Sequence, residues 1–174
     1  MLHGGGNTSV KVAATNLLGD VEEVLYVKGS GWDLATIEAA GFAPVRLAVA
    51  RRMATLKALS DSDMVRILRT ALLDPEAPSP SVETILHAII PFRYVDHTHA
   101  DAVVTVMNIA QGARRIRVLY GDRVLVVPYV MRGFLLARTV YEMTRKIQWT
   151  TLDGILLMHH GLLTFDDDAK IEGS

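Results

Sequence analysis

The stretch VDHTHAD, Val95 to Asp101, carries two histidines one residue apart. In an extended chain successive side chains point to opposite faces, so His97 and His99 project from the same side of a strand. A third histidine, His160, follows a second apolar run in LLMHHGLL, residues 156–163. Three imidazoles with a vacant fourth position are typical of a catalytic zinc site rather than a structural one. The sequence therefore predicts a metal-dependent enzyme.

The neighbouring His159 competes with His160 for the third position. On a straight strand the two side chains face opposite sides, so only one of them can join His97 and His99. The spacing does not choose between them. The H-x-H pair alone also fits a polar pair on an exposed strand. Apolar residues on both sides of the pair favour buried imidazoles instead.

The composition restricts the classes of protein to consider. A chain of 174 residues, of which 50% are apolar and 21% charged, predicts one globular domain over residues 1–174. The net charge of -1 gives no reason to expect nucleic acid or an anionic membrane as a partner. The chain has no cysteine, so a transition metal must be bound by nitrogen and oxygen. Neither a membrane-spanning run nor a signal peptide is visible, which predicts a cytoplasmic protein.

Strand and helix patterns alternate loosely along the chain. Strands are expected at residues 9–14, 24–29, 94–99, 124–130 and 154–165. Helices are expected at residues 45–59, 81–91, 100–110 and 133–147. A further helix is expected to begin after an N-cap at Ser60 or Ser62. The loose alternation favours an α/β sandwich over a strict parallel doubly wound sheet.

Two glycine-bearing loops could bind an anion. The amides of HGGGNTS, residues 3–9, could surround a phosphate or carboxylate, although the residues alone favour a flexible terminus. KGSGW, residues 28–32, offers the Ser30 hydroxyl and the Gly31 amide, and an ordinary turn explains it equally well. An anionic substrate needs both a cation and directed donors, so two such loops beside a metal would act together.

Glu83 falls in the first turn of a predicted helix. An acid there complements the helix dipole, which is a sufficient structural explanation. Beside a metal-bound carbonyl, the same carboxylate could remove a proton from carbon, and partial burial would raise its pKa for that role. His87, one turn later, is expected to be a packed core histidine.

Six segments in order along nearly the whole chain resemble the class II aldolase/adducin superfamily: GGGNTS, VKGSGWDL, DPEAPSPSVE, VDHTHADAV, VPYVMRGF and LLMHHGLLTF. The match is closest to the aldolase part of rhamnulose-phosphate aldolase/short-chain dehydrogenase-like proteins. The resemblance implies an α/β fold, a three-layer α/β/α sandwich with a mainly antiparallel central sheet. Because relatives continue beyond both ends of the matched region, we expect a domain shortened at both ends, with impaired activity.

The resemblance also implies a set of site residues. Zn²⁺, or another divalent transition metal, is expected on His97, His99 and His160, the histidine immediately before the glycine. The catalytic carboxylate falls on Glu83. Positions that bind substrate phosphate fall on Gly6, Asn7, Ser30, Gly31 and Ser81.

The implied activity is that of a lyase, the reversible retro-aldol cleavage of a ketose 1-phosphate or related sugar. The metal would act as a Lewis acid that stabilises an enediolate, and Glu83 would move the proton. A sugar-phosphate epimerase or dehydratase on the same scaffold is an alternative, as is a non-catalytic domain like the adducin head. The implied partners are a small-molecule sugar phosphate and further copies of the chain in a homotetramer. A tyrosine from a neighbouring subunit is the acid in some relatives, with Tyr120 and Tyr129 as candidates here.

Two residues depart from the pattern of the family. Val82 stands where fuculose-phosphate relatives have a second serine, so one phosphate-binding hydroxyl is missing. Arg132 stands where the closest relatives are expected to have proline, which restores a backbone donor and adds a charge.

Overall fold

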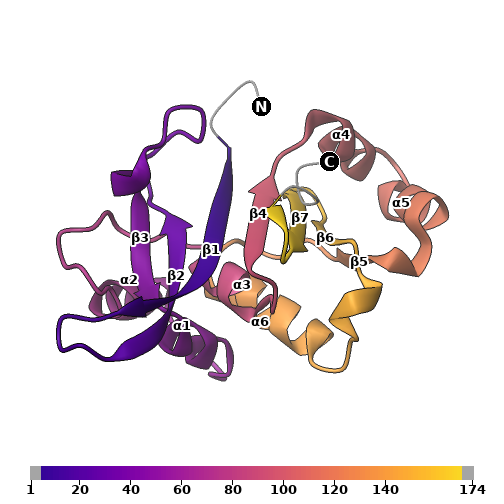
Figure 1. Cartoon of the computed structure of the whole chain (residues 1–174). Coiled ribbons are helices and arrows are strands. Elements are labelled where there is room, and N and C mark those ends of the chain that lie inside the picture. Colours follow the sequence, from indigo (N-terminus) through magenta and orange to yellow (C-terminus); the bar gives the residue numbers. More distant parts are fainter. Residues whose placement is uncertain (1–4, 170–174) are drawn as a thin grey trace.

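A seven-stranded sheet in the order β3-β2-β1-β4-β7-β6-β5 forms the centre of the molecule, as seen in a computed structural model that describes residues 5–169 (Figure 1). Its strands are β1 (Gly6–Thr15), β2 (Val21–Lys28), β3 (Phe42–Arg46), β4 (Tyr94–Thr98), β5 (Val124–Val127), β6 (Gly154–Leu157) and β7 (Gly161–Asp166). The α-helices are α1 (Leu47–Ala54), α2 (Asp61–Thr70), α3 (Thr84–Ile89), α4 (Asp101–Asn108), α5 (Gly112–Tyr120) and α6 (Phe134–Thr144). Short 3₁₀ helices are η1 (Ala39–Gly41), η2 (Gly121–Arg123) and η3 (Trp149–Thr151).

The sheet is mixed. Five pairs of neighbouring strands are antiparallel and one pair, β5 with β6, is parallel. The expectation of a mainly antiparallel sheet is therefore too simple, although it describes most of the pairs. The exception arises because α6 lies between β5 and β6 in the chain, and such a crossover connection is what parallel strands require.

These pairings bring several loops to one edge of the sheet. Strands β2, β4, β5 and β6 all end there, whereas β1, β3 and β7 begin there. Figure 1 shows β4 pointing toward the start of β1. We call this edge the site edge, because the three histidines and both glycine-bearing loops lie along it.

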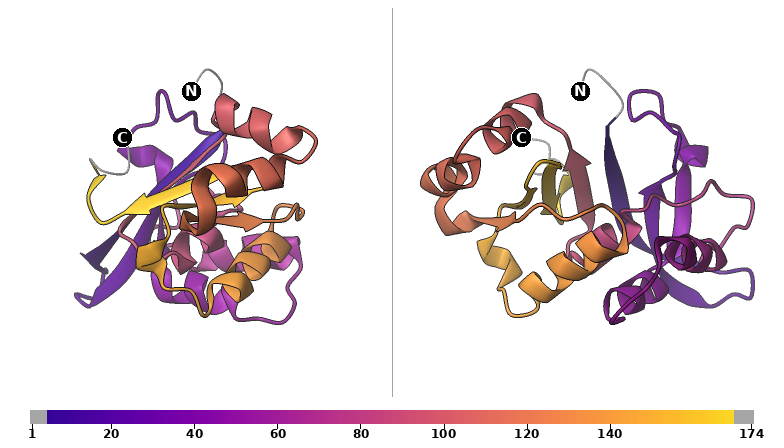
Figure 2. Two further views of the ribbon diagram at one scale, coloured as in Figure 1. Left: turned by 90° about the vertical axis from the view of Figure 1, so that its right-hand side faces the viewer. Right: turned by 180° about the vertical axis from the view of Figure 1, so that it is seen from behind.

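Helices cover the two faces of the sheet unequally. Residues of α1, α2, α3 and α6 form the main core with one face, whereas α4 and α5 cover the other face only over β5, β6 and β7 (Figure 2). Side chains of β6 alternate accordingly, with Ile155 and Leu157 in the main core and Leu156 against Met107 and Ile116. Three layers are thus complete at the β5 end of the sheet.

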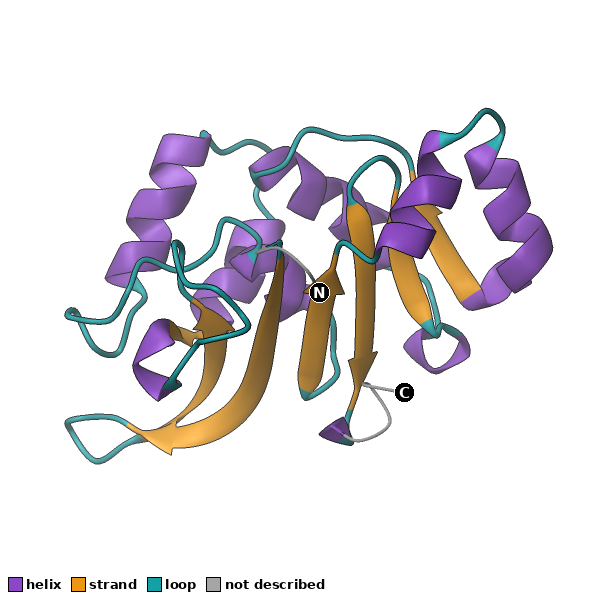
Figure 3. Ribbon diagram, turned by 90° about the horizontal axis from the view of Figure 1, so that it is seen from above, coloured by secondary structure: helices purple, strands orange, loops and turns teal. Residues whose placement is uncertain are grey.

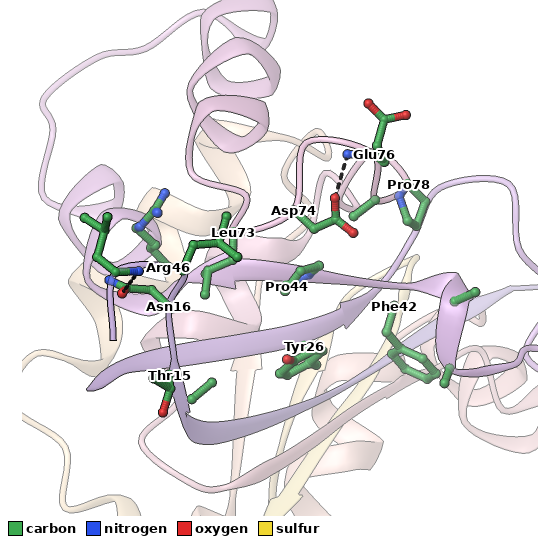
Figure 4. A pocket seen from close by; sticks show the side chains of 16 residues that line it. Thr15, Asn16, Tyr26, Phe42, Pro44, Arg46, Leu73, Asp74, Glu76 and Pro78 are labelled. Carbon is green, nitrogen blue, oxygen red and sulfur yellow. Dashed lines mark hydrogen bonds between the residues drawn. The ribbon is translucent and has the colours of Figure 1, made fainter. Parts of the chain in front are cut away.

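The remaining part of the second face carries a hollow. The long, twisted β1–β2 hairpin projects beyond the other strands (Figure 3). On its outer side a cavity of about 730 Å³ is lined by Tyr26, Phe42 and Pro44 among others (Figure 4). None of the helices within residues 5–169 is long and apolar enough to cross a membrane.

Several predicted elements are confirmed. Residues 101–108 are helical, and Ser60 caps α2 because its hydroxyl accepts a hydrogen bond from the Asp63 amide. The third predicted helix begins at Thr84, and the hydroxyl of Ser81 caps the turn before it by accepting from the Glu83 amide.

Two predictions are wrong in instructive ways. The helix expected at residues 45–59 is shorter, because Val45 pairs with Leu25 in the edge strand β3 and α1 starts only at Leu47. The single strand expected at residues 154–165 is two strands, β6 and β7, joined by a turn in which His159 has a φ of 58°. The turn reverses the chain, so β7 pairs antiparallel with β6.

Candidate metal centre

Three histidines converge at the site edge. His97 lies near the end of β4, His99 directly follows that strand, and His160 ends the turn before β7, which pairs with β4. The Nε2 atoms of His97 and His99 are 3.0 Å apart, and one ring nitrogen from each of the three residues lies within 4.8 Å of the others. Side chains distant in sequence are thus brought together by two neighbouring strands.

Two glycines make room for this convergence. A Cβ on Gly161 would lie 2.7 Å from Cε1 of His97 and 2.8 Å from Cδ2 of His99. A Cβ on Gly5 would collide with Nδ1 of His99. Real Cβ atoms do not approach so closely, so the backbone can pass the imidazoles only where no side chain is present.

The turn at His159 decides which neighbouring histidine joins the pair. The positive φ of His159 directs its ring to the far side, where Nδ1 lies 2.6 Å from Oδ1 of Asn108. Its ring also contacts that of Tyr129, with centroids 6.1 Å apart. Because the chain is not extended here, the alternation argument does not apply, and His160 is the residue that reaches His97 and His99.

Glu83 directs its carboxylate at the same point from the start of α3. Its Oε1 lies 3.1 Å from Nε2 of His160 and 3.5 Å from Nε2 of His97. The side chain is only 11% exposed. The cluster therefore consists of three imidazoles and one nearly buried carboxylate.

Electrostatics set the charge state of this cluster. Burial acts to raise the pKa of Glu83, but the contact with His160 and the nearby His97 outweigh it and lower the pKa to about 2. The expected rise in the pKa of this carboxyl is thus wrong for the metal-free protein. Burial lowers the pKa of His97 to about 4 and also lowers that of His99, against the pull of Glu83. At neutral pH the ionised carboxylate of Glu83 therefore faces a neutral imidazole at His97.

This donor set fits a divalent transition metal. Nδ1 of His97 and both ring nitrogens of His160 are buried without a hydrogen-bond partner, because the contact with Glu83 is not aligned as a hydrogen bond. Unpaired buried nitrogens are costly, and a cation would satisfy those that face the cluster. Ligand nitrogens around tetrahedral zinc are about 3.3 Å apart, close to the separation between His97 and His99. Among residues 5–169, these three histidines are the one group of His, Asp or Glu side chains that lie close enough together to hold a metal ion.

The predicted anion-binding residues of the first loop lie beside the histidines. Asn7 is paired directly with His97 across β1 and β4, and Gly6 with Thr98. Asn7 is 2% exposed, and its Oδ1 has no hydrogen-bond partner. A buried carboxamide oxygen without a partner next to the imidazoles is a group in position for a ligand.

The second loop lies beside the turn that precedes Glu83. Gly29 forms a bridge with Pro80, and the Ser30 hydroxyl donates to the Pro80 carbonyl at 3.4 Å. The Ser81 hydroxyl accepts from the Glu83 amide at 3.2 Å. Gly31 has a φ of 86° and stays exposed. The structure thus brings these predicted residues to the site edge, with both serine hydroxyls already bonded to the protein.

Asn108, which orients His159, carried no signal in the sequence. Gly5 of the first loop contacts His99, and the candidate tyrosine Tyr129 contacts His159. The other candidate tyrosine, Tyr120, lines a separate hollow of about 450 Å³ between α4–α5 and the sheet. His87 is fully buried, as expected, and its Nδ1 lies 2.8 Å from the Ser9 hydroxyl.

Comparisons with known proteins agree with this architecture. The family model of the Class II Aldolase and Adducin N-terminal domain matches residues 1–170. The N-terminal class II aldolase domain of a conserved protein from Thermoplasma acidophilum is 41% identical with a TM-score of 0.88, over 97% of this chain and 77% of that one. The chain therefore belongs to the class II aldolase and adducin N-terminal domain family.

Two further comparisons show how far the similarity in sequence and in structure extends. The uncharacterized oxidoreductase YuxG of Bacillus subtilis (strain 168) is 37% identical over 167 residues, which are 96% of this chain and 24% of YuxG. The chain thus spans about a quarter of that relative. The l-fuculose-1-phosphate aldolase of Thermus thermophilus has a TM-score of 0.53 at 18% identity, over 95% of this chain and 69% of that one, which supports the fold alone.

Proposed function

We propose that the protein is a divalent-metal-dependent aldolase that cleaves a sugar phosphate, in the first instance a ketose 1-phosphate, by a reversible retro-aldol reaction. The observation that carries the proposal is the convergence of His97, His99 and His160 on the carboxylate of Glu83. The family contains sugar-phosphate aldolases of the same fold, such as the fuculose-phosphate enzyme.

The three imidazoles would hold the metal, with Zn²⁺ the first candidate. When bound, such an ion supplies Lewis-acid polarisation of a substrate carbonyl. Burial keeps His97 and His99 neutral at neutral pH, which leaves their nitrogen lone pairs available. Gly161 and Gly5 fix the distance between the backbone and the rings.

Glu83 would hold the proton that moves to or from the substrate carbon. Its carboxylate is ionised at neutral pH, nearly buried, and directed at the imidazoles, so Oε1 is the atom that accepts the proton. Position and a shielded environment, rather than a raised pKa in the metal-free protein, qualify it for this role.

The phosphate would bind beside Glu83 on the β2 side of the site. Asn7 would contribute the N–H groups of its carboxamide, and the loop around Ser30 and Gly31 would contribute backbone donors. Gly6 and Ser81 flank these groups. We also propose a homotetramer, as implied by the resemblance.

Metal analysis and a turnover assay test the proposal together. We expect about one metal per chain, and release of triose phosphate from at least one ketose 1-phosphate. Glu83→Gln should keep the metal and lower kcat by roughly 10²–10⁴, whereas His97→Ala should lose the metal. Stoichiometric metal without cleavage of any ketose 1-phosphate would reject the aldolase and leave the metal site intact.

Epimerase and dehydratase chemistry would use the same residues, so a screen of pentose and ketose phosphates for isomerised or dehydrated products belongs to the same experiment. A non-catalytic interaction domain predicts instead that the purified protein binds no metal, and that His97→Ala changes neither stability nor oligomeric state. The convergence of unpartnered buried nitrogens speaks against that alternative.

A further inference from the structure

The loop between β5 and α6, residues 128–133, lies at the site edge on the side away from the Ser30 loop. β5 and β2 both run parallel to β4, so the loops that follow them open toward the same edge. In the strand order, β1 and β2 lie on one side of β4, and β7, β6 and β5 lie on the other. The histidines are therefore located between two loops, of which the proposed function uses only one.

This second loop is fixed at both of its ends, by a histidine at one and by α2 at the other. Near its start, Tyr129 is 59% exposed and contacts the ring of His159 edge-on. At its end, Gly133 packs so closely on Asp61 that no side chain fits, and the Phe134 amide donates to the Asp61 carboxylate at 3.0 Å. The loop therefore has a defined position relative to the metal centre.

Arg132 is the charged residue of this loop. Its side chain is exposed, and within residues 5–169 it takes part in no hydrogen bond or ion pair that would neutralise it. It belongs to the loop in which Tyr129 contacts His159, the residue before the proposed ligand His160. A free cation beside a site that would hold another cation is electrostatically unfavourable unless an anion lies between them.

The His159 turn provides directed groups beside this charge. A left-handed backbone is unfavourable for a residue other than glycine, and such strain is characteristic of functional sites. The ring is oriented by Asn108, whose Oδ1 accepts from Nδ1–H and leaves Nε2 as the second polar atom of the ring. Tyr129 adds a hydroxyl next to it.

The opposite side of the site is less well equipped for an anion than the family resemblance implies. The Ser30 hydroxyl already donates to the Pro80 carbonyl, the Ser81 hydroxyl accepts from the Glu83 amide and keeps its own proton to donate, and Val82 has no hydroxyl. That side offers amide groups and one hydroxyl, whereas the loop after β5 offers a full positive charge in a planar donor group.

We propose that Arg132 is a specificity-determining residue, which binds an anionic group of the substrate, a carboxylate or a phosphate, on the β5 side of the metal centre, with the Tyr129 hydroxyl as a neighbouring donor. The proposal rests on the proposed metal-dependent function and narrows its substrate class. The substrate would carry an anion that extends from the reacting carbonyl toward β5.

Matched metal-chelating inhibitors test the role of Arg132 in the metal-loaded protein. Acetohydroxamate is neutral, whereas phosphoglycolohydroxamate and the monohydroxamate of succinate add a phosphate or a carboxylate to the same chelating group. We expect the wild type to bind one anionic compound roughly 10- to 100-fold more tightly than acetohydroxamate. Arg132→Gln should lower this ratio roughly tenfold, with the affinity for acetohydroxamate unchanged, and any phosphate preference that remains belongs to the Asn7 side of the site. The compound that benefits identifies the anion.

Two matched variants complete the test. Arg132→Lys keeps the charge without the planar donor group and should retain part of the ratio. Arg114→Gln removes an exposed arginine of α5 and should leave the ratio unchanged. An anion preference that Arg132→Gln leaves at its wild-type value, or a wild type with no preference, overturns the proposal even if metal binding and cleavage stand.

A second measurement does not need the metal. The Nε–Hε resonance of Arg132, identified by its absence in Arg132→Gln, should shift in a saturable way when the metal-free protein is titrated with methyl phosphate or glycolate. If the protein binds no metal, the proposed function fails and this titration alone decides the role of Arg132. No shift at tens of millimolar of either probe then overturns it.

Discussion

Gly161 packs directly against the ring of His97, since a Cβ at residue 161 would lie 2.7 Å from Cε1 of that imidazole. The first residue of β7 therefore limits where the rings of His97 and His99, two of the proposed metal ligands, can lie. Substitution at this position tests the metal centre without removing any ligand.

Gly161→Ala should weaken metal binding and destabilise the protein by about 1–3 kcal/mol, because the extra methyl group must displace the rings or the Thr98 carbonyl. Competition with a chelator gives the metal affinity, and thermal unfolding gives the stability. Gly121→Ala is the matched control, because Gly121 has a positive φ and no atom near the position of a Cβ. It should cost stability without changing metal affinity. Equal metal affinities in both variants would contradict the geometry.

His160→Ala should reduce metal affinity by on the order of 100-fold or more, because it removes one of three ligands. His159→Ala should leave that affinity nearly unchanged, since its ring is turned toward Asn108. Calorimetric titration with Zn²⁺ measures both variants. The reverse result would show that the neighbouring histidine is the ligand.

The metal-free protein should lose stability on acidification below about pH 6.5. Burial lowers the pKa of His87 to about 3 and that of His97 to about 4. Between these values and the ordinary histidine pKa, the unfolded chain therefore binds more protons than the folded chain. Stability from these groups is complete above the ordinary histidine pKa of about 6.5 and is lost as the pH falls toward the folded values. His87→Asn should reduce the slope between pH 5 and 6 by about 1.4 kcal/mol per pH unit.

Urea unfolding at several pH values in the presence of a chelator measures this slope. His159→Gln, at an exposed ring, is the matched control and should leave it unchanged. A variant at residue 87 with the wild-type slope would show that His87 is protonated in the folded protein.

Asn7→Ala should weaken binding of a phosphate-bearing inhibitor with little effect on the stability of the protein. The Oδ1 atom of Asn7 is buried without a partner, so removal of the side chain should change stability by less than about 1 kcal/mol. Loss of the carboxamide N–H donors should weaken a phosphate-bearing inhibitor about tenfold. Ser9→Ala, two residues along β1, should do the opposite, because it deprives buried His87 of its partner at a cost of about 1–3 kcal/mol. Similar losses of inhibitor affinity in both variants would argue against a direct role for Asn7.

The sequence predicted the helices around the site better than the strands. The apolar spacing of Leu47, Met53 and Leu56 resembles one continuous helix, and nothing local shows that Val45 belongs to a strand. Edge strand β3 is defined by its pairing with β2, a long-range contact that periodicity does not report. Its proline is tolerated because the strand lies at an edge.

The same limit applies to the candidate site. The spacing of His97 and His99 placed both rings on one side, but the choice between His159 and His160 depended on the family resemblance. The deciding turn has a left-handed non-glycine residue in the middle of an apolar run, for which no local signal exists. The pKa of Glu83 depends on His160 and His97, which only the folded chain brings near.

The short turn at His159 also couples the register of the sheet to the chemistry. Only residues 158–160 connect β6 to β7, so the chain has no slack between them. If β7 slid by one residue along β4, the third imidazole would leave the cluster and Gly161 would no longer lie opposite the other rings. An insertion or deletion that shifted this register would therefore abolish metal binding and disturb the core together, because Leu163 and Phe165 would turn to the opposite face of the sheet.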